Sequence, residues 1–152
     1  MKKVKRKIIS LPPNYFYACI VLTILTIFIP NVKTIISYPY NLLGILIMIL
    51  GFYLISITYL QFSKSKTPES FEKSKCVVTT GLYKYSRNPM YIGSIIFLIG
   101  LSILIKTLIG FVFPIALFLI LNYMFIPFEE EKMEKELGKK YLKYKKTVRR
   151  WI

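Results

Sequence analysis

The chain has 152 residues, of which 55% are hydrophobic, and its formal net charge is +15. A mean hydropathy of +0.52 excludes an ordinary soluble domain and indicates a single membrane domain covering residues 1–152. The sequence contains no histidine and no aspartate, which excludes histidine-based triads, most zinc sites and EF-hand loops, so we expect no metal site.

Two uncharged runs near the start of the chain predict transmembrane helices. The first run follows a basic segment, as in a signal peptide, but no small-residue cleavage site comes after it. We therefore interpret it as a retained helix at about residues 15–29, preceded by the proline pair Pro12-Pro13. The second run predicts a span at about residues 41–61, in which Gly44 and Gly51 allow close helix contact.

The longest polar segment, residues 64–87, separates these spans from the second half of the chain. A loop of this length in a small domain is usually functional or disordered. The run Val77-Val78-Thr79-Thr80 before Gly81 resembles a short extended piece, so we expect the segment to be ordered. Cys19 lies in the first apolar run and Cys76 in this polar segment, which argues against a disulfide framework.

Residues 88–128 form one apolar stretch that is interrupted only by Lys106. A lysine at the bilayer centre costs about 2.5–3.5 kcal/mol on insertion scales. A single helix of this length would also be too long to cross the membrane once. Both problems disappear if Lys106 and Thr107 form a turn, so the sequence predicts a helical hairpin with spans at about residues 89–105 and 108–126.

The distribution of lysine and arginine predicts the orientation in the membrane. Nearly all of them lie in the amino-terminal tail, the loop of residues 64–87 and the carboxyl-terminal tail. The other two loops hold one each, Lys33 and Lys106. With four spans the three basic segments share one side, which the positive-inside rule makes cytoplasmic. We expect a multi-pass membrane protein with both termini in the cytoplasm and no nucleic-acid partner.

The tail, residues 129–152, is predicted to form one amphipathic cytoplasmic helix. Its apolar residues recur every three or four positions, and its opposite face is rich in lysine. We expect this helix to dock on anionic lipid of the inner leaflet, and it can also cover a pocket. The apolar stripe consists of Met133, Leu137, Tyr141, Tyr144, Val148 and Trp151.

A first polar cluster, residues 81–93, precedes the predicted hairpin. Gly81 lets a ligand approach the backbone, and the guanidinium of Arg87 suits a carboxylate. Asn88 and Pro89 are typical of an N-cap and of the first residue of a helix. A capped membrane helix with interfacial tyrosines explains this pattern, and so does a pocket for an anionic group at the helix N-terminus.

A second cluster, Glu129-Glu130-Glu131, follows the last predicted span. Acidic residues are favourable in the first turn of a helix, which accounts for one or two of them. If the hairpin forms, this cluster lies beside the first one. A pocket between donors and carboxylates suits a zwitterionic ligand with a positive charge, such as S-adenosylmethionine. Its sulfonium would meet the aromatic faces of Tyr83, Tyr85 and Tyr91.

The order and spacing of these residues resemble the integral-membrane methyltransferases of the isoprenylcysteine carboxyl methyltransferase and phospholipid methyltransferase group. That family carries an Arg-His-Pro-x-Tyr-x-Gly element, often with Asn for His, then a membrane hairpin and a Glu-Glu pair. Here these elements are Arg87-Asn88-Pro89-Met90-Tyr91-Ile92-Gly93 and Glu129-Glu130. The family's Leu-Val-Thr-x-Gly-x-Tyr type run, which precedes these elements, corresponds to residues 77–83. Its Leu-x-x-x-Phe-Gly-x-x-Tyr pattern, which follows them, corresponds to Met133, Leu137, Gly138 and Tyr141. The resemblance covers about residues 67–152, the expected cofactor-binding half.

The resemblance implies a methyltransferase that uses S-adenosylmethionine and acts on a lipid or lipidated acceptor. Methyl transfer from a sulfonium is a direct displacement, so the protein must mainly align the reactants, with Tyr91 in the site. An amine acceptor must also lose a proton, and Glu129 or Glu130 is positioned to take it. The expected cofactor contacts are Lys75, Cys76, Val77, Val78, Gly81, Tyr83, Arg87, Asn88, Pro89, Met90, Tyr91 and Glu129.

Two positions depart from the family pattern. Asn88 replaces the histidine, so no imidazole is present to titrate or to orient a group. In the prenylcysteine enzymes an arginine four residues before the Glu-Glu pair binds the substrate carboxylate, whereas Phe125 stands here. This departure argues against a prenylcysteine carboxylate as the acceptor.

Two other functions stay open on the sequence alone. Membrane sterol reductases are distantly similar in the same half and bind NADPH, although the chain has no glycine-rich phosphate motif. The non-enzymatic alternative is a small membrane scaffold whose basic tail docks on anionic lipid.

Overall fold

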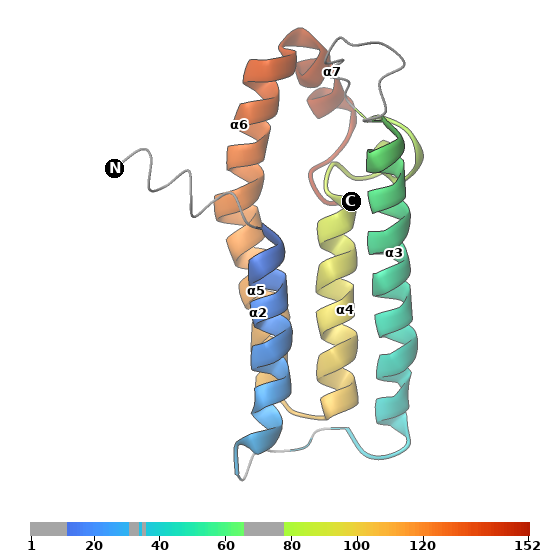
Figure 1. Ribbon diagram of the computed structural model, residues 1–152, viewed down its shortest axis with the longest axis vertical. Coiled ribbons are helices and arrows are strands. Elements are labelled where there is room, and N and C mark those ends of the chain that lie inside the picture. Colours follow the sequence, from blue (N-terminus) through green and yellow to red (C-terminus); the bar gives the residue numbers. More distant parts are fainter. Residues whose placement is uncertain (1–11, 31–33, 35, 66–77) are drawn as a thin grey trace, which may run out of the picture.

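A computed structural model describes residues 12–30, 34, 36–65 and 78–152 (Figure 1). Within these residues the regular structure is helical, apart from one isolated bridge between Thr34 and Thr107, and this confirms the all-α class. The α-helices are α2 (Pro12–Leu25), α3 (Leu43–Ser65), α4 (Pro89–Ile105), α5 (Val112–Ile120), α6 (Ile126–Leu137) and α7 (Lys139–Thr147). The shorter helical segments are the 3₁₀ helices η1 (Thr26–Phe28), η2 (Tyr40–Leu42), η3 (Gly81–Lys84) and η4 (Ile109–Phe111) and the π-helix η5 (Leu121–Phe125).

The bundle has the apolar character of a membrane protein. Two helical segments, Tyr40–Ser63 and Ile109–Leu137, are long and apolar enough to cross a membrane, and the mean hydropathy of the most apolar 18-residue stretch of each is 2.3. Pro12–Phe28 and Pro89–Ile105 are shorter apolar helices. Large apolar side chains on the outside of the bundle are exposed, as Leu46 of α3 is at 63%. Such a surface suits lipid better than water, and it supports an association with the membrane.

The observed helix bounds follow the predicted spans with small shifts. Helix α4 has the predicted bounds, because Asn88-Pro89 and Lys106 mark both of its ends. Helix α2 begins at Pro12, so the expectation that the proline pair precedes the helix is wrong. Proline is tolerated there because the first turn of a helix needs no amide donor. Helix α3 continues to Ser65, four residues past the predicted end at residue 61.

Glycines bring α3 and α4 into direct backbone contact. A Cβ atom on Gly44 would lie 2.4 Å from the carbonyl oxygen of Gly100, and one on Gly51 would lie 2.8 Å from that of Gly93. These distances are too short for any side chain larger than hydrogen. The expectation of close contact at Gly44 and Gly51 is therefore confirmed, and Gly93 of the first polar cluster has a packing role. Small residues of this kind let membrane helices approach closely.

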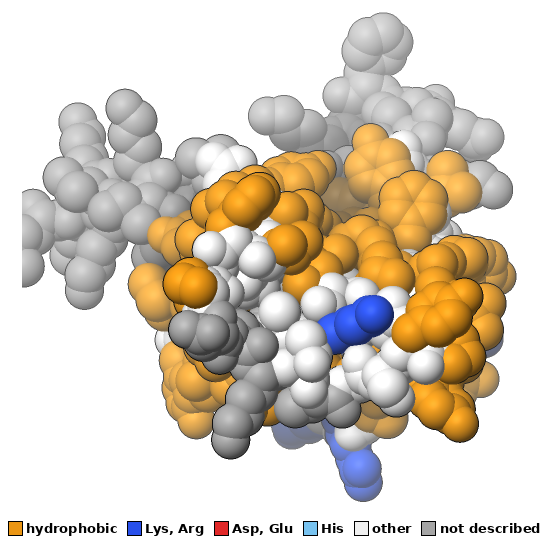
Figure 2. Space-filling view, turned by 90° about the horizontal axis from the view of Figure 1, so that it is seen from below, with side chains coloured by type: hydrophobic (Ala, Val, Ile, Leu, Met, Phe, Trp, Pro, Cys, Tyr) orange, Lys and Arg blue, Asp and Glu red, His pale blue; other side chains and the backbone are white. Residues whose placement is uncertain are grey.

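The chain reverses direction at Lys106, as predicted. Lys106 adopts the left-handed conformation, with φ 67°, and its amide donates to the carbonyl oxygens of Ser102 and Ile103 at 3.1 Å. Thr107 follows and shares a hydrogen bond of 2.9 Å with Thr26, which ties the turn to η1, directly after α2. Figure 2 views this end of the bundle, where apolar side chains surround a centre of backbone and non-apolar side chains, and few of the described residues visible there are basic.

The expected single tail helix over residues 129–152 is wrong. Its first part belongs to α6, which continues α5 through the π-helical segment η5. The chain then bends at Gly138, where φ is 53° and ψ is −128°, a conformation that favours glycine. Helix α7 ends at Thr147, and Val148 is extended with φ −120° and ψ 133°. Figure 1 shows that α7 crosses the upper end of the bundle and that the chain then returns to the start of α4.

The packed interior holds α2, α4 and α5 together. Leu98 of α4, Leu117 of α5 and Leu121 and Phe125 of η5 are at most 1% exposed. The ring of Tyr15 meets that of Phe125 edge-on, with the centroids 5.1 Å apart. This core fixes α4 against the long helix that contains α5 and α6, and so fixes the two polar clusters that those helices carry.

Candidate functional site

The two polar clusters meet at the end of the bundle opposite the Lys106 turn. The hydroxyl of Tyr91, in the first turn of α4, donates a hydrogen bond of 2.8 Å to Oε1 of Glu129 in α6. The two residues are 38 positions apart and are brought together by the hairpin. The predicted neighbourhood of Tyr91 and Glu129 is therefore confirmed.

A cavity of about 500 Å³ opens beside this contact. Its volume lies in the range of roughly 300–1,000 Å³ that is usual for small-molecule sites. The end of α3, the segment before α4, the first turn of α4, helix α6 and helix α7 all contribute to its walls. The lining residues are Phe62, Val78, Tyr83, Arg87, Asn88, Pro89, Met90, Tyr91, Ile126, Glu129, Glu130, Lys132, Met133, Glu136, Tyr141 and Tyr144.

Most of the residues expected to contact a cofactor line this cavity. They are Val78, Tyr83, Arg87, Asn88, Pro89, Met90, Tyr91 and Glu129. Lys75, Cys76 and Val77 lie outside the described residues. Gly81 does not line the cavity but sits against α3, where a Cβ atom would lie 2.2 Å from Nε2 of Gln61. With φ at 62°, Gly81 serves the turn that leads to Tyr83.

Sequence reasoning missed several lining residues. Lys132, Glu136 and Phe62 were not singled out, whereas Met133, Tyr141 and Tyr144 belonged only to the predicted apolar stripe. The stripe itself was the sequence signal for Met133, Tyr141 and Tyr144, because an apolar face on a polar tail is expected to pack against another surface. Tyr85, expected to offer an aromatic face, is instead 74% exposed and does not line the cavity.

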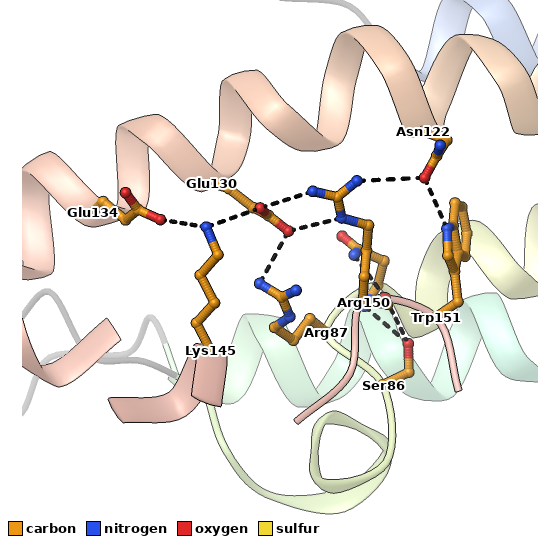
Figure 3. Close-up of polar contacts among 9 residues, drawn as sticks. Ser86, Arg87, Asn122, Glu130, Glu134, Lys145, Arg150 and Trp151 are labelled. Atoms are coloured by element: carbon orange, nitrogen blue, oxygen red, sulfur yellow. Dashed lines mark hydrogen bonds and ion pairs between the residues drawn. The ribbon is translucent and has the colours of Figure 1, made fainter. Parts of the chain in front are cut away.

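Glu130 stands at the centre of a cluster of positive side chains (Figure 3). Its carboxylate is paired with Nη1 of Arg87 at 3.0 Å and with Nζ of Lys145 at 3.2 Å. Arg150 binds it with two parallel hydrogen bonds of 3.1 Å, from Nε to Oε1 and from Nη2 to Oε2. Glu130 is only 5% exposed, so these partners compensate for its burial. The carboxylate expected to act as a base is therefore committed to ion pairs.

Asn88 occupies the N-cap position of α4, but its side chain does not cap the helix. Its Nδ2 instead donates a hydrogen bond of 2.9 Å to the carbonyl oxygen of Arg150. The backbone amide of Asn88 donates a hydrogen bond of 3.1 Å to Oγ of Ser86. The predicted N-cap position of Asn88 before Pro89 is therefore confirmed, but its side chain binds the returning chain instead of the first turn of the helix.

The electrostatics of the two adjacent glutamates differ. Burial raises the pKa of Glu129, and the hydrogen bond from Tyr91 and the charge of Lys132 offset this effect only in part. Burial would also raise the pKa of Glu130, but Arg150, Arg87 and Lys145 together hold it below its ordinary value.

The cavity tyrosines are neutral at physiological pH. Burial and the charge of Glu129 raise the pKa of Tyr83 to about 12. Burial, with Tyr83 and Tyr141 nearby, raises that of Tyr144 to about 12 as well. The hydroxyl of Tyr144 donates to the carbonyl oxygen of Tyr83 at 2.8 Å, which fixes the wall that these two rings form.

These features describe a small helical protein of membrane character with a cavity, lined in part by polar side chains, at one end of its bundle. Residues 40–140, about two thirds of the chain, match the profile of the phospholipid methyltransferase family. The chain therefore belongs to that family, as the resemblance predicted, and the family makes it an enzyme of the membrane methyltransferase class. No curated protein matches the chain closely enough to count as a relative.

Proposed function

We propose that this protein transfers a methyl group from S-adenosylmethionine to a lipid or lipidated acceptor. The observation that carries the proposal is the contact between Tyr91 and Glu129 at the wall of the 500 Å³ cavity. It joins the two halves of the family pattern at a single site. The isoprenylcysteine-type pattern of residues 87–93 supports the same reading.

The residues of the cavity fit the chemistry of this cofactor. Arg87 lines the cavity, and we propose that its guanidinium, whose buried Nε has no hydrogen-bond partner among the described residues, binds the cofactor's carboxylate. Glu129 makes one hydrogen bond within the described chain and keeps its second oxygen for the ammonium or a ribose hydroxyl. The rings of Tyr83, Tyr91 and Tyr144 offer faces that tolerate a positive sulfur.

The roles of the remaining predicted contacts follow from their places in the chain. Val78, Asn88, Pro89 and Met90 line the cavity and would shape the adenosine end of the site. Lys75, Cys76 and Val77, outside the described residues, and Gly81, at the turn before Tyr83, stay part of the proposed set of cofactor contacts. The cofactor-binding half then covers about residues 67–152, as the resemblance implies.

When bound, S-adenosylmethionine supplies a methyl group on a positively charged sulfur that is already activated for direct displacement. The chain must then hold the donor and acceptor in line and keep water out. Tyr91 would be fixed for this task by its bond to Glu129. Where the acceptor is an amine, Glu129 would take the proton, because its raised pKa makes it the stronger base of the glutamate pair.

The acceptor is proposed to be a membrane lipid or another lipophilic molecule. Phe125, at the position of the carboxylate-binding arginine in the prenylcysteine enzymes, is 1% exposed and packs in the core. It offers no charge to a substrate carboxylate, which argues against a prenylcysteine acceptor. Phe62 and Ile126 give the cavity an apolar side where an acyl-chain molecule would fit.

We further propose four membrane crossings, with both termini and the cavity on the cytoplasmic side. The lysines of α7 would then face the anionic lipid of the inner leaflet. A soluble cofactor would reach the cavity from the cytosol, and a lipophilic acceptor from the bilayer.

The test is transfer of a labelled methyl group from S-adenosylmethionine into a membrane extract by the purified protein. We expect the label in a lipid-soluble species, and a strong loss of transfer in Tyr91→Phe. Tyr85→Phe is the matched control, because Tyr85 is exposed and away from the cavity. Absence of label in every fraction, with the protein folded, would contradict the proposal.

A further inference from the structure

We infer that residues 148–152, here called the strap, hold the cavity-lining loop in place, and that Arg150 and Trp151 are positioning residues for the cavity. The inference rests on the proposed cofactor role of that cavity. None of the five strap residues lines the cavity, so any effect on binding must pass through the residues that the strap contacts.

The backbone of the strap binds the loop that leads into α4. The carbonyl oxygen of Arg149 accepts a hydrogen bond of 3.0 Å from the amide of Arg87. The carbonyl oxygen of Arg150 accepts one of 2.9 Å from Nδ2 of Asn88 and one of 3.4 Å from Oγ of Ser86. Arg87 and Asn88 both line the cavity. Because the strap carbonyls bind them, the strap helps to fix this part of the cavity wall.

The side chain of Arg150 binds the strap to the opposite wall (Figure 3). It makes the paired hydrogen bonds to Glu130 of α6, and Nη1 lies 3.5 Å from Oδ1 of Asn122 in η5. A bidentate pair of this kind fixes direction as well as distance. Arg150 therefore connects the loop before α4, through its carbonyl, with α6, through its guanidinium.

Trp151 provides the second attachment. Its Nε1 donates a hydrogen bond of 3.1 Å to Oδ1 of Asn122, and its ring centroid lies 5.0 Å from that of Phe118 in α5. Asn122 thus accepts from both strap side chains. It lies outside the cavity lining, on the part of the long helix that faces the bundle.

A docked strap and a formed cavity should stabilise one another. If docking favours the binding-competent loop, then a cofactor in the cavity must favour docking by the same factor. Trp151 reports this directly, because it is the only tryptophan in the chain. Its fluorescence should be better protected from a soluble quencher when the cavity is filled.

The experiment compares Arg150→Ala with Arg149→Ala in the full-length protein. Both remove one positive charge from the strap, but the side chain of Arg149 is exposed, whereas that of Arg150 binds Glu130. A second test variant, Asn122→Leu, removes the acceptor that Arg150 and Trp151 share without changing any residue of the cavity. The readouts are calorimetric affinity for S-adenosylhomocysteine, iodide quenching of Trp151 with and without that ligand, and the melting temperature.

We expect Arg150→Ala and Asn122→Leu to weaken S-adenosylhomocysteine binding by about tenfold, an ordinary size for coupling between sites. Quenching of Trp151 should rise in both variants and fall again when the ligand is added, whereas Arg149→Ala should behave as the unmodified protein. Unchanged affinity in both test variants, or a ligand with no effect on quenching, would overturn the inference alone. An unmodified protein that does not bind S-adenosylhomocysteine would overturn the proposed function together with it.

Discussion

At the residue scale, two neighbouring glutamates have separate tasks. Successive helix residues point about 100° apart, so Glu129 reaches Tyr91 while Glu130 reaches Arg87, Lys145 and Arg150. The sequence predicted that this acidic cluster would meet the residues before α4, and it does. It could not distinguish the two carboxylates, because the partners of Glu130 come from α7 and the strap, whose path depends on the bend at Gly138.

Exchanging each glutamate for glutamine should separate these tasks. Glu129→Gln should lower the affinity for S-adenosylhomocysteine by about 10- to 100-fold, the size of a lost charged hydrogen bond of 1.5–3 kcal/mol, with little loss of stability. Glu130→Gln should lower the free energy of unfolding by about 3 kcal/mol, because three cations lose their shared partner. Calorimetry and thermal melting in lipid nanodiscs measure both effects, and equal behaviour of the two variants would contradict the assignment.

Cofactor binding should also depend on pH through Glu129. The ionised form binds the ligand's ammonium, and burial raises the pKa of this carboxyl above the ordinary value. The affinity should therefore be highest above the raised pKa and should fall as the pH drops through it. The fall should occur at a higher pH than for an ordinary glutamate, whose pKa is ~4.3. Binding titrations from the ~4.3 of an ordinary glutamate up to neutral pH test this dependence. The profile of Glu129→Gln should be flat, and a profile that matches the unmodified protein would contradict the role of Glu129.

At the element scale, the helices were predictable where one residue type forces the outcome. Lys106 cannot stay inside an apolar helix at the bilayer centre, and Asn88-Pro89 starts a helix, so α4 and its turn followed from the sequence. The break between α6 and α7 did not follow, because the three- and four-residue spacing of apolar side chains continues through Gly138. The backbone bend at Gly138 shows that this periodic pattern belongs to two helices, and α7 contributes Tyr141 and Tyr144 to the cavity wall.

The contact between α3 and α4 gives a prediction with an unusual sign. Alanine usually stabilises a helix relative to glycine by about 0.8–1.0 kcal/mol. Gly44→Ala should destabilise this protein instead, by about 1–3 kcal/mol, because the new methyl group would meet the backbone of α4. Leu46→Ala, on the exposed side of α3, is the control and should cost less. Thermal melting measures both variants, and a more stable Gly44→Ala protein would contradict the packing.

At the scale of the whole molecule, charge and site share one end of the bundle. The cavity and the cluster around Glu130 lie at the end of the bundle where α6 and α7 meet, and Figure 1 shows this end opposite the turn that follows α4. The sequence predicted this grouping from the positions of lysine and arginine alone. It could not predict the shape of the cavity, which depends on residues from both halves of the chain.

Labelling of single cysteines should test the proposed orientation. In a background with Cys76 replaced by serine, Lys106→Cys should react with a membrane-impermeant maleimide only from outside the cell. Lys140→Cys, on α7, should react only from the cytoplasmic side, because basic segments stay inside. Cys19 is 7% exposed and should stay unreactive, which makes it an internal control. Labelling of both positions from the same side would contradict four crossings.

The most direct test of the central claim is a calorimetric titration of the folded protein, in lipid nanodiscs, with S-adenosylhomocysteine and, separately, with NADPH. The account predicts saturable binding of one S-adenosylhomocysteine per chain, weakened by Glu129→Gln, and no binding of NADPH. Binding of NADPH alone, or of neither ligand, would contradict a methyl-donor site between α4 and α6.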